Sequence, residues 1–402
     1  MNKSLTRRIE TLSEAKKRIL EAKMWEQEGK NGQLTESKKN VVITDNNPEH
    51  PMDFSLFFFA QESENVPDSK YDFLLQAAQY ADQHDFHAVW TPERHYKDFG
   101  GLYPNPSVLS AALAAITCKI QIRAGSVVLP LHSPERVAEE WSVVDNLSGG
   151  RVGIAIASGW NPDDFATHPA LFNQRRTLLM EKLTTVQQLW RGESFSTSAG
   201  KSLRIYPSPL QKELPVWLTS LSEDSFVTAG RLGLNILTGM MEHDIDGLTQ
   251  KIVLYRKARE NHGHNPATGK VTVMLHTYIG DNDDDVKTLV KAPMMRYLHA
   301  FVAAGEAKII GDNRFDTAYH HEQAGDRDAL LNYTFERYFA TRALMGTQES
   351  CKNMVINMKN IGVNEIACLL DFGLESQTIF AGIKKLNMLR EMFSLRHTHR
   401  RV

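Results

Sequence analysis

Eight short apolar runs recur along the chain from residue 54 onward, with amphipathic helical patterns between them. The helical spacing of apolar residues is clear at 70–83, 105–117 and 133–147. Strands that alternate with helices predict a parallel sheet, and eight such units predict a closed (β/α)8 barrel, the TIM-barrel fold. The eight predicted strands are 54–60, 86–91, 120–129, 152–158, 215–219, 234–238, 271–279 and 363–370.

The span from 52 to 392 exceeds the ~250 residues typical of this fold, so insertions are required. The sequence places one at 192–214 and a larger one at about 281–347. Within the larger one, polar residues 311–328 predict a loop, and a helical pattern follows. The alternative fold is an open doubly wound sheet, which normally has a glycine-rich turn after its first strand. Here that strand runs into AQESENVPDSK, which contains no glycine and argues against the alternative.

Three segments divide the chain. Residues 1–51 predict a charged helix followed by a polar linker, residues 52–392 carry the barrel pattern, and residues 393–402 form a basic tail. The first segment has two interpretations, a solvated flank or a docking segment left from a multidomain assembly.

Composition excludes several classes of protein. The 402 residues are 42% hydrophobic and 23% charged with a formal net charge of -2, without the basic excess typical of nucleic-acid-binding proteins. The three cysteines lack metal-ligand spacing, so no metal site is expected. Neither a signal peptide nor a bilayer-length apolar stretch is found, so we expect a cytoplasmic protein that does not insert into membranes.

Residues that follow the predicted strands should meet at one end of the barrel, where active sites of this fold lie. They include histidines, hydroxyls and aromatics, but no HExxH helix and no GxSxG turn, so barrel-type metal hydrolases and serine hydrolases are poorly supported. The candidates are Glu93, Arg94, His95, His132, Ser158, Trp160, Asn161, Ser220, Ser222, Ser225 and Asp371.

The segment SLSEDS (220–225) predicts a helix start with two interpretations. Free N–H groups and hydroxyls at such an end bind phosphate well. Alternatively, Ser222 is a plain N-cap, with Glu223 and Asp224 complementing the helix dipole. His95 also has two interpretations, an acid–base residue or a packing histidine.

Several motifs together resemble the bacterial-luciferase-like, flavin-dependent monooxygenases. They are AVWTPERHY (88–96), GLYPNPSVLSAALAA (101–115), residues 122–165, LWRGE (189–193) and GVNEIACLLDFG (362–373). Within that superfamily they are most similar to a subgroup associated with nonribosomal peptide and polyketide synthases. The resemblance implies a (β/α)8 barrel that takes reduced FMN (FMNH2) from a separate flavin reductase and activates O2 as a flavin peroxide. A homodimer is also expected.

The resemblance assigns roles near the flavin ring. Glu93, Arg94 and His95 match the Glu-His-His triplet of luciferase and become the catalytic candidates. Arg94 replaces a histidine needed for light emission, so light emission is not expected here. Gly125 and Ser126 match the site of a non-proline cis peptide that lies against the flavin ring.

The resemblance also assigns roles near the phosphate. Ser222 and Ser225 match the phosphate-binding serine and threonine of luciferase, and Leu221 replaces its glutamate. Ser220 is included as a neighbouring flavin contact. Ser158 is a further candidate, and it stands where luciferase has an arginine, so that arginine contact is missing.

The expected function is therefore an FMNH2- and O2-dependent oxidation of a natural-product intermediate. An acyl or peptidyl group on a carrier protein is one candidate substrate, and the position of oxidation stays open. Two alternatives are kept. One is a deazaflavin-dependent hydride-transfer enzyme, which would need basic residues that the phosphate loop lacks. The other is a non-catalytic flavin-binding barrel.

Overall fold

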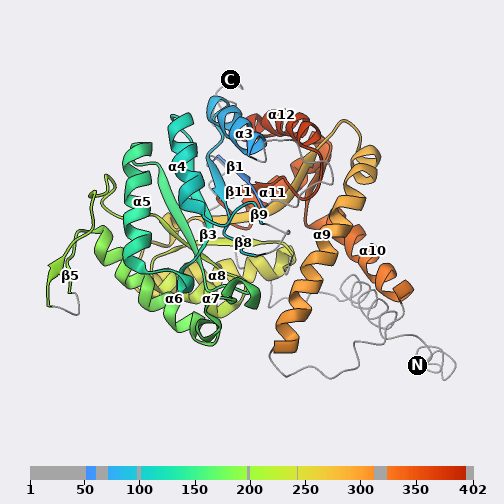
Figure 1. Cartoon of the computed structure of the whole chain (residues 1–402). Helices are drawn as coiled ribbons and strands as arrows, with labels where there is room; N and C mark the ends of the chain where they lie inside the picture. Colours follow the sequence, from blue (N-terminus) through green and yellow to red (C-terminus); the bar gives the residue numbers. More distant parts are fainter. Residues whose placement is uncertain are drawn as a thin grey trace.

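A computed structural model describes residues 51–59, 71–96, 101–196, 200–241, 243–311 and 324–394. Its centre is a closed barrel of eight parallel strands, as the sequence predicts (Figure 1). The order around the barrel is β1-β2-β3-β4-β7-β8-β9-β11. The strands are β1 (Asp53–Phe57), β2 (Ala88–Thr91), β3 (Gln121–Val128), β4 (Val152–Ala157), β7 (Val216–Thr219), β8 (Asn235–Gly239), β9 (Val271–Ile279) and β11 (Glu365–Leu369).

The pairing of the first and last barrel strands closes the barrel, and the pairing of β8 with β9 completes the ring of neighbours. β1 pairs with β11 in the register Phe54↔Ile366, and β8 pairs with β9 in the register Ile236↔Val271. Every pairing within the barrel is parallel, so all eight carboxyl ends lie at the same end. We call this end the barrel mouth.

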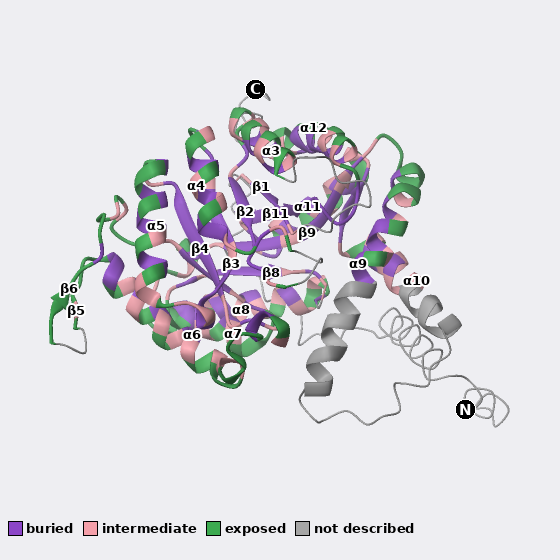
Figure 2. Cartoon of the chain, viewed as in Figure 1, coloured by how far each residue is buried: buried purple, intermediate pink, exposed green. Residues whose placement is uncertain are grey.

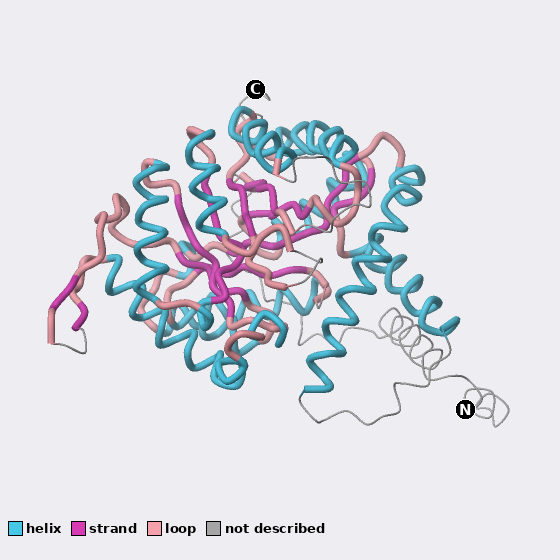
Figure 3. The backbone as a smooth tube through the Cα atoms, viewed as in Figure 1, coloured by secondary structure: helices cyan, strands magenta, loops and turns pink. Residues whose placement is uncertain are grey.

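Helices surround the barrel, as Figure 3 shows. Local sequence explains their limits, and α5 is an example: Ser133 is its N-cap, Pro134 stands in its first turn, and Gly149 ends it at φ 70°. The helices are α3 (Asp72–Gln83), α4 (Pro106–Ile116), α5 (Pro134–Ser148), α6 (Pro169–Trp190), α7 (Glu223–Arg231), α8 (Ile245–Asn261), α9 (Asp283–Gly311), α10 (Ala324–Thr341), α11 (Gln348–Asn360) and α12 (Ser376–Met392). Short 3-10 turns are η2 (Leu129–Leu131), η3 (Pro162–Phe165) and η4 (Pro266–Thr268).

Both predicted insertions are present. The first contains a small hairpin, β5 (Phe195–Ser196) and β6 (Ser202–Leu203), which extends from the barrel in Figure 1. The second contains α9, α10 and the strand β10 (Leu344–Gly346), which pairs with β9 and which the sequence pattern did not predict. The predicted helix in 1–51 and residues 312–323 of the predicted loop lie outside the described residues. The described ends of that loop are helical instead, since Gly311 belongs to α9 and 324–328 to α10.

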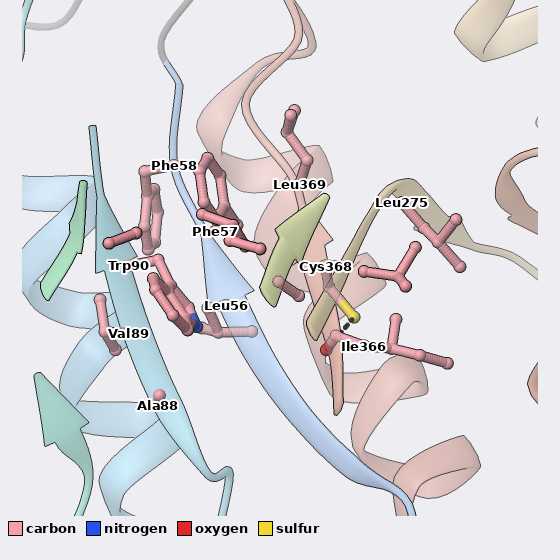
Figure 4. Packing of buried hydrophobic residues seen from close by; sticks show 14 of the residues in the cluster. Leu56, Phe57, Phe58, Ala88, Val89, Trp90, Leu275, Ile366, Cys368 and Leu369 are labelled. Atoms are coloured by element: carbon pink, nitrogen blue, oxygen red, sulfur yellow. Dashed lines mark hydrogen bonds between the residues drawn. The ribbon is translucent and has the colours of Figure 1, made fainter. Parts of the chain in front are cut away.

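Apolar side chains fill the space between strands and helices, and Figure 2 shows the strands buried and the outer helix faces exposed. Phe57 and Trp90 stack with ring centroids 6.4 Å apart, and Figure 4 shows them side by side. Cys368 is fully buried, which raises the pKa of its thiol to about 12. Its burial and high pKa make Cys368 a packing residue rather than a nucleophile.

A charged cluster lies inside the barrel at the end opposite the mouth. Glu365, the first residue of β11, accepts a 2.7 Å hydrogen bond from Arg123 and one of 3.0 Å from the Trp90 indole. Burial alone would raise the pKa of Glu365, but Arg123 and neighbouring donors lower it to about 2. The guanidinium of Arg123 is 4.3 Å from the centroid of the Trp217 ring. This cluster is a satisfied buried ion pair, and active sites of this fold lie at the other end of the barrel.

Candidate active site

The candidates of the second and third strands meet at the barrel mouth. Glu93 and His95 follow the end of β2 at Thr91, and His132 follows η2 at the end of β3. β2 and β3 are hydrogen-bonded neighbours, so residues after their carboxyl ends are brought together. The sequence names all three residues, but only the fold brings His132 to Glu93.

Glu93 is hydrogen-bonded to both histidines. Its Oε1 is 2.8 Å from His95 Nε2 and 2.6 Å from His132 Nε2, and its Oε2 accepts a 2.7 Å bond from the Val128 N–H. The Glu93 side chain is 0% exposed, whereas those of His95 and His132 are 18% and 34% exposed. We call Glu93, His95 and His132 the Glu93 triad.

The triad sets the charges of its own members. Burial would raise the pKa of Glu93, but hydrogen bonds from His132, His95 and Val128 hold it below its usual value. Burial would lower the pKa of His132, but the hydrogen bond and charge of Glu93 raise it overall. Glu93 is thus a carboxylate at neutral pH, and it favours a protonated imidazole beside it.

Arg94 is held as a buried cation next to the triad. Its NH1 is 3.4 Å from Asp164 Oδ2, and its guanidinium lies 4.8 Å from the centroid of Trp160 and 6.0 Å from that of Phe59. Burial lowers the pKa of Arg94, partly offset by Asp164. Its buried Nε has no hydrogen-bond partner among the described residues, so this atom can donate to a bound molecule.

Asp164 also links Arg94 to the triad. Its Oδ1 accepts a 3.2 Å hydrogen bond from the His95 N–H. Asp164 lies in the short turn η3. Asn161 is the N-cap of this turn, and its side chain accepts a 3.0 Å hydrogen bond from the Asp163 N–H. The sequence analysis did not select Asp164. The polar segment WNPDDF, which follows β4, was the sequence feature that could have identified this residue.

Further polar contacts lie around Asp371, after β11, and between His276 of β9 and Tyr338 of α10. Asp371 accepts hydrogen bonds from the Phe59 N–H at 2.6 Å and the Tyr103 hydroxyl at 3.2 Å. His276 Nδ1 is 2.7 Å from the Tyr338 hydroxyl, and burial lowers the pKa of His276 to about 3, so the imidazole is neutral. Asp371 was a sequence candidate, whereas His276 was hidden inside an apolar strand.

Gly125 and Ser126 form a non-proline cis peptide, as the resemblance implies. Both residues are half-buried, although Ala124 and Val127 on either side are buried. Apart from its first residue, Gln121, β3 is therefore partly exposed only at this peptide. The Ser126 hydroxyl lies 2.5 Å from that of Thr219 at the end of β7, so two strands of the mouth are linked here.

The other serine candidates differ in how their hydroxyls are used. Ser220 is 0% exposed and donates to the Leu218 carbonyl at 3.1 Å. Ser158 is half-buried, and its hydroxyl is 3.5 Å from the Gly159 carbonyl. Ser158 is thus the more available of the two for a bound molecule.

Ser222 and Ser225 form a capping box at the start of α7. The Ser225 N–H donates to Ser222 Oγ at 3.3 Å, and the Ser222 N–H donates to Ser225 Oγ at 3.1 Å. The N-cap interpretation of Ser222 is confirmed, and the phosphate interpretation stays a prediction. Lys251 of α8 donates to the Leu221 carbonyl at 2.8 Å, which adds a cation beside this loop that the sequence analysis missed.

These residues fit a flavin mononucleotide. The open cis peptide of β3, the half-buried Ser158 after β4 and the start of α7 after β7 lie on neighbouring barrel strands. A flat ring needs an open backbone surface, and a phosphate needs helix N–H groups, hydroxyls and a nearby cation. No set of three His, Cys, Asp or Glu in the described ranges could hold a metal ion. Within those ranges, no helix has both the length and the apolar composition to cross a bilayer.

Sequence comparison matches residues 52–365 to the family described as luciferase-like monooxygenase. A relative from Acinetobacter baylyi, the oxygenase component of a flavin-dependent trigonelline monooxygenase, is 27% identical over 59% of this chain and 67% of its own. The alkanal monooxygenase alpha chain of the Kryptophanaron alfredi symbiont is 22% identical over 77% of this chain and 89% of its own.

Solved structures share the fold. Monooxygenase RslO1 from Streptomyces bottropensis aligns with a TM-score of 0.69 at 20% identity, over 86% of this chain and 100% of that one. The oxygenating constituent of 3,6-diketocamphane monooxygenase from Pseudomonas putida, in complex with FMN, aligns with a TM-score of 0.68 at 17% identity, over 85% and 97%. An F420-dependent secondary alcohol dehydrogenase aligns with a TM-score of 0.63 at 15% identity, over 84% and 98%.

Proposed function

Because this chain belongs to the luciferase-like monooxygenase family, we propose that it uses FMNH2 and O2 to oxidise a natural-product intermediate. The proposed chemistry is that of a flavin peroxide. The proposed substrate is a small molecule or an acyl or peptidyl group on a carrier protein, as the resemblance to the assembly-line subgroup suggests. A separate flavin reductase supplies the FMNH2, and the protein works as a cytoplasmic homodimer.

The observation that carries this proposal is the position of the Glu93 triad beside an open cis peptide. Glu93 and His95 follow β2, and Gly125–Ser126 stands in the neighbouring β3. A ring lying on this peptide would have an acid–base group and the buried Arg94 cation near one edge. The phosphate would extend over β4 and β7 to the start of α7.

When bound, reduced FMN supplies the two electrons that activate molecular oxygen. The residues of the chain have separate roles around it. Glu93 orients the His95 imidazole through the 2.8 Å hydrogen bond, and His95 holds or releases a proton at its other nitrogen. Arg94 stabilises negative charge that develops nearby, because its buried guanidinium is weakly screened.

The requirement for a partner reductase gives a direct test. The relative from Acinetobacter baylyi is the oxygenase component of its system, and we propose the same division of labour here. Purified protein with FMN and NADPH should consume no oxygen until a flavin reductase is added. FMNH2 should bind more tightly than oxidised FMN in anaerobic titrations. NADPH oxidation by the protein alone, with tightly held flavin, would contradict the two-component proposal.

The second candidate is deazaflavin-dependent hydride transfer. Lys251 favours it, because this lysine places a cation next to the phosphate loop where the sequence showed none. Parallel titrations with FMNH2 and with a reduced deazaflavin separate the two candidates. Preferential binding of the deazaflavin, with no oxygen consumption, would support the second candidate. Binding without turnover of either cofactor would indicate a non-catalytic barrel.

A further inference from the structure

The two histidines of the Glu93 triad use the same carboxylate oxygen. Glu93 Oε1 is 2.8 Å from His95 Nε2 and 2.6 Å from His132 Nε2. We propose that His132 is a positioning residue that competes with His95 for one proton through the charge of Glu93, and so sets the protonation state of His95. The proposal rests on the function proposed above, in which His95 handles a proton of the reaction.

The hydrogen bonds fix the tautomer of both imidazoles. An ionised carboxylate only accepts hydrogen bonds, so His95 and His132 each carry hydrogen on Nε2. In each ring, Nδ1 is then the atom that gains or loses the proton. A neutral ring is a base at Nδ1, and a charged ring is an acid at the same atom. The triad thus presents two acid–base atoms whose orientation is set by one carboxylate.

Charge balance makes the two rings compete. A single carboxylate balances one imidazolium, and a second proton would place two positive rings on the same oxygen. Groups so closely linked titrate as a pair rather than independently. A proton on one ring therefore disfavours a second proton on the other, and loss of either ring removes this competition.

The surrounding charges do not remove this competition. On the His95 side, Arg94 is opposed by Asp164, which accepts from the His95 N–H at 3.2 Å. On the His132 side, Lys182 donates to the His132 carbonyl at 2.7 Å, and Glu140 provides a negative charge. Each histidine thus has one positive and one negative neighbour, so Glu93 is the charge that decides how the proton is distributed between the two rings.

Exposure gives the two rings different roles. His132 is 34% exposed and exchanges protons with solvent more readily than His95, which is 18% exposed. His132 therefore acts as the outer ring, and it loads or unloads the triad as the pH changes. The proton balance is simple: each proton that His95 releases at Nδ1 is replaced by one that the pair takes from water.

The test is an NMR titration of the histidine ring nitrogens in the full-length protein without flavin. In wild type, His132 Nε2 should stay protonated over the whole pH range, and the titration curve of the His132 ring should show two steps. His95→Gln retains a donor to Glu93 but cannot titrate, so the His132 titration should move to higher pH and become a single step. Glu93→Gln should move it to lower pH. His262→Gln, at the end of α8, is the matched control and should leave it unchanged.

Activity adds a second measurement that a purely structural role would not change. With reductase supplied, His132→Gln should shift the pH profile of product yield to higher pH and lower product per oxygen at the wild-type optimum. An identical His132 titration in wild type and His95→Gln would overturn the proposal, as would an unshifted pH profile. If wild type consumes no oxygen at all, the proposed function fails, and the flavin-free titration still decides whether the two rings compete for a proton.

Discussion

At the scale of single residues, His95 is the side chain on which the proposed chemistry depends most directly. Its ring is held by Glu93 at the barrel mouth, whereas the candidate phosphate residues belong to α7. His95→Ala should therefore bind FMNH2 normally but release hydrogen peroxide in place of product. The product yield should fall by about 100-fold or more, which is the usual contribution of an acid–base group.

The measurement is product and hydrogen peroxide formed per oxygen consumed. His262→Ala, far from the mouth at the end of α8, serves as the control and should keep wild-type coupling. Normal coupling in His95→Ala would remove His95 from the mechanism and leave it as a packing residue.

Glu365 makes a different prediction, because its role is stability. It is 0% exposed and pairs with Arg123, so Glu365→Gln leaves a buried cation without its counter-charge. The free energy of unfolding should fall by about 3–5 kcal/mol, measured by urea denaturation. Glu349→Gln, in a surface pair with Lys352, is the control and should have little effect.

The pH dependence of stability has a definite sign for Glu365. Its pKa falls from 4.5 to about 2 on folding. Burial, the largest single effect, raises the pKa, but Arg123, His87 and the hydrogen bonds from Ser55 and Trp90 together lower it by more. A lowered carboxyl pKa gives stability that is complete above the unfolded value and is lost as the pH falls toward the folded one. Wild type should therefore lose stability between about pH 4.5 and pH 2, and Glu365→Gln should lose less over that range.

At the scale of elements, the start of α7 serves both as a helix cap and as the proposed phosphate site. Ser222→Ala with Ser225→Ala should weaken FMNH2 binding by about 1–3 kcal/mol, the scale of hydrogen bonds to a charged group. It should also cost about 1 kcal/mol of stability, because the capping box is lost.

A second helix separates these two effects. Thr347 is the N-cap of α11 and accepts from the Ser350 N–H at 3.2 Å. Thr347→Ala should cost similar stability and leave FMNH2 binding unchanged. Titration calorimetry and thermal melts measure the two quantities. A loss of stability with full FMNH2 affinity in the serine variant would leave Ser222 and Ser225 as a cap alone.

At the scale of the whole molecule, the barrel closes without any residue before 52. β1 begins at Asp53 and pairs on one side with β11 and on the other with β2. Removal of residues 1–50 should therefore leave the barrel folded, with a melting temperature nearly unchanged. If the segment docks a carrier protein, the truncated enzyme should keep activity on a free thioester and lose it on a carrier-bound one. Insolubility of the truncated protein would contradict this division of the chain.

The sequence by itself determined the eight strands and the helices α3, α4 and α5, because these depend on local patterns of apolar residues, caps and prolines. It also gave the candidate loops, since most of the candidate residues follow a predicted strand, and their roles stay predictions. The sequence did not predict the strand β10, because its three residues are too few to show an alternating pattern.

Only the tertiary structure decided which of these residues act together. Glu93 and His132 are 39 positions apart, and Arg123 and Glu365 are 242 apart. No periodic pattern links such distant positions, because they meet only when neighbouring strands align and the barrel closes. The charges depend on that closure as well, since burial and partners set the pKa of Glu93, His132 and Glu365.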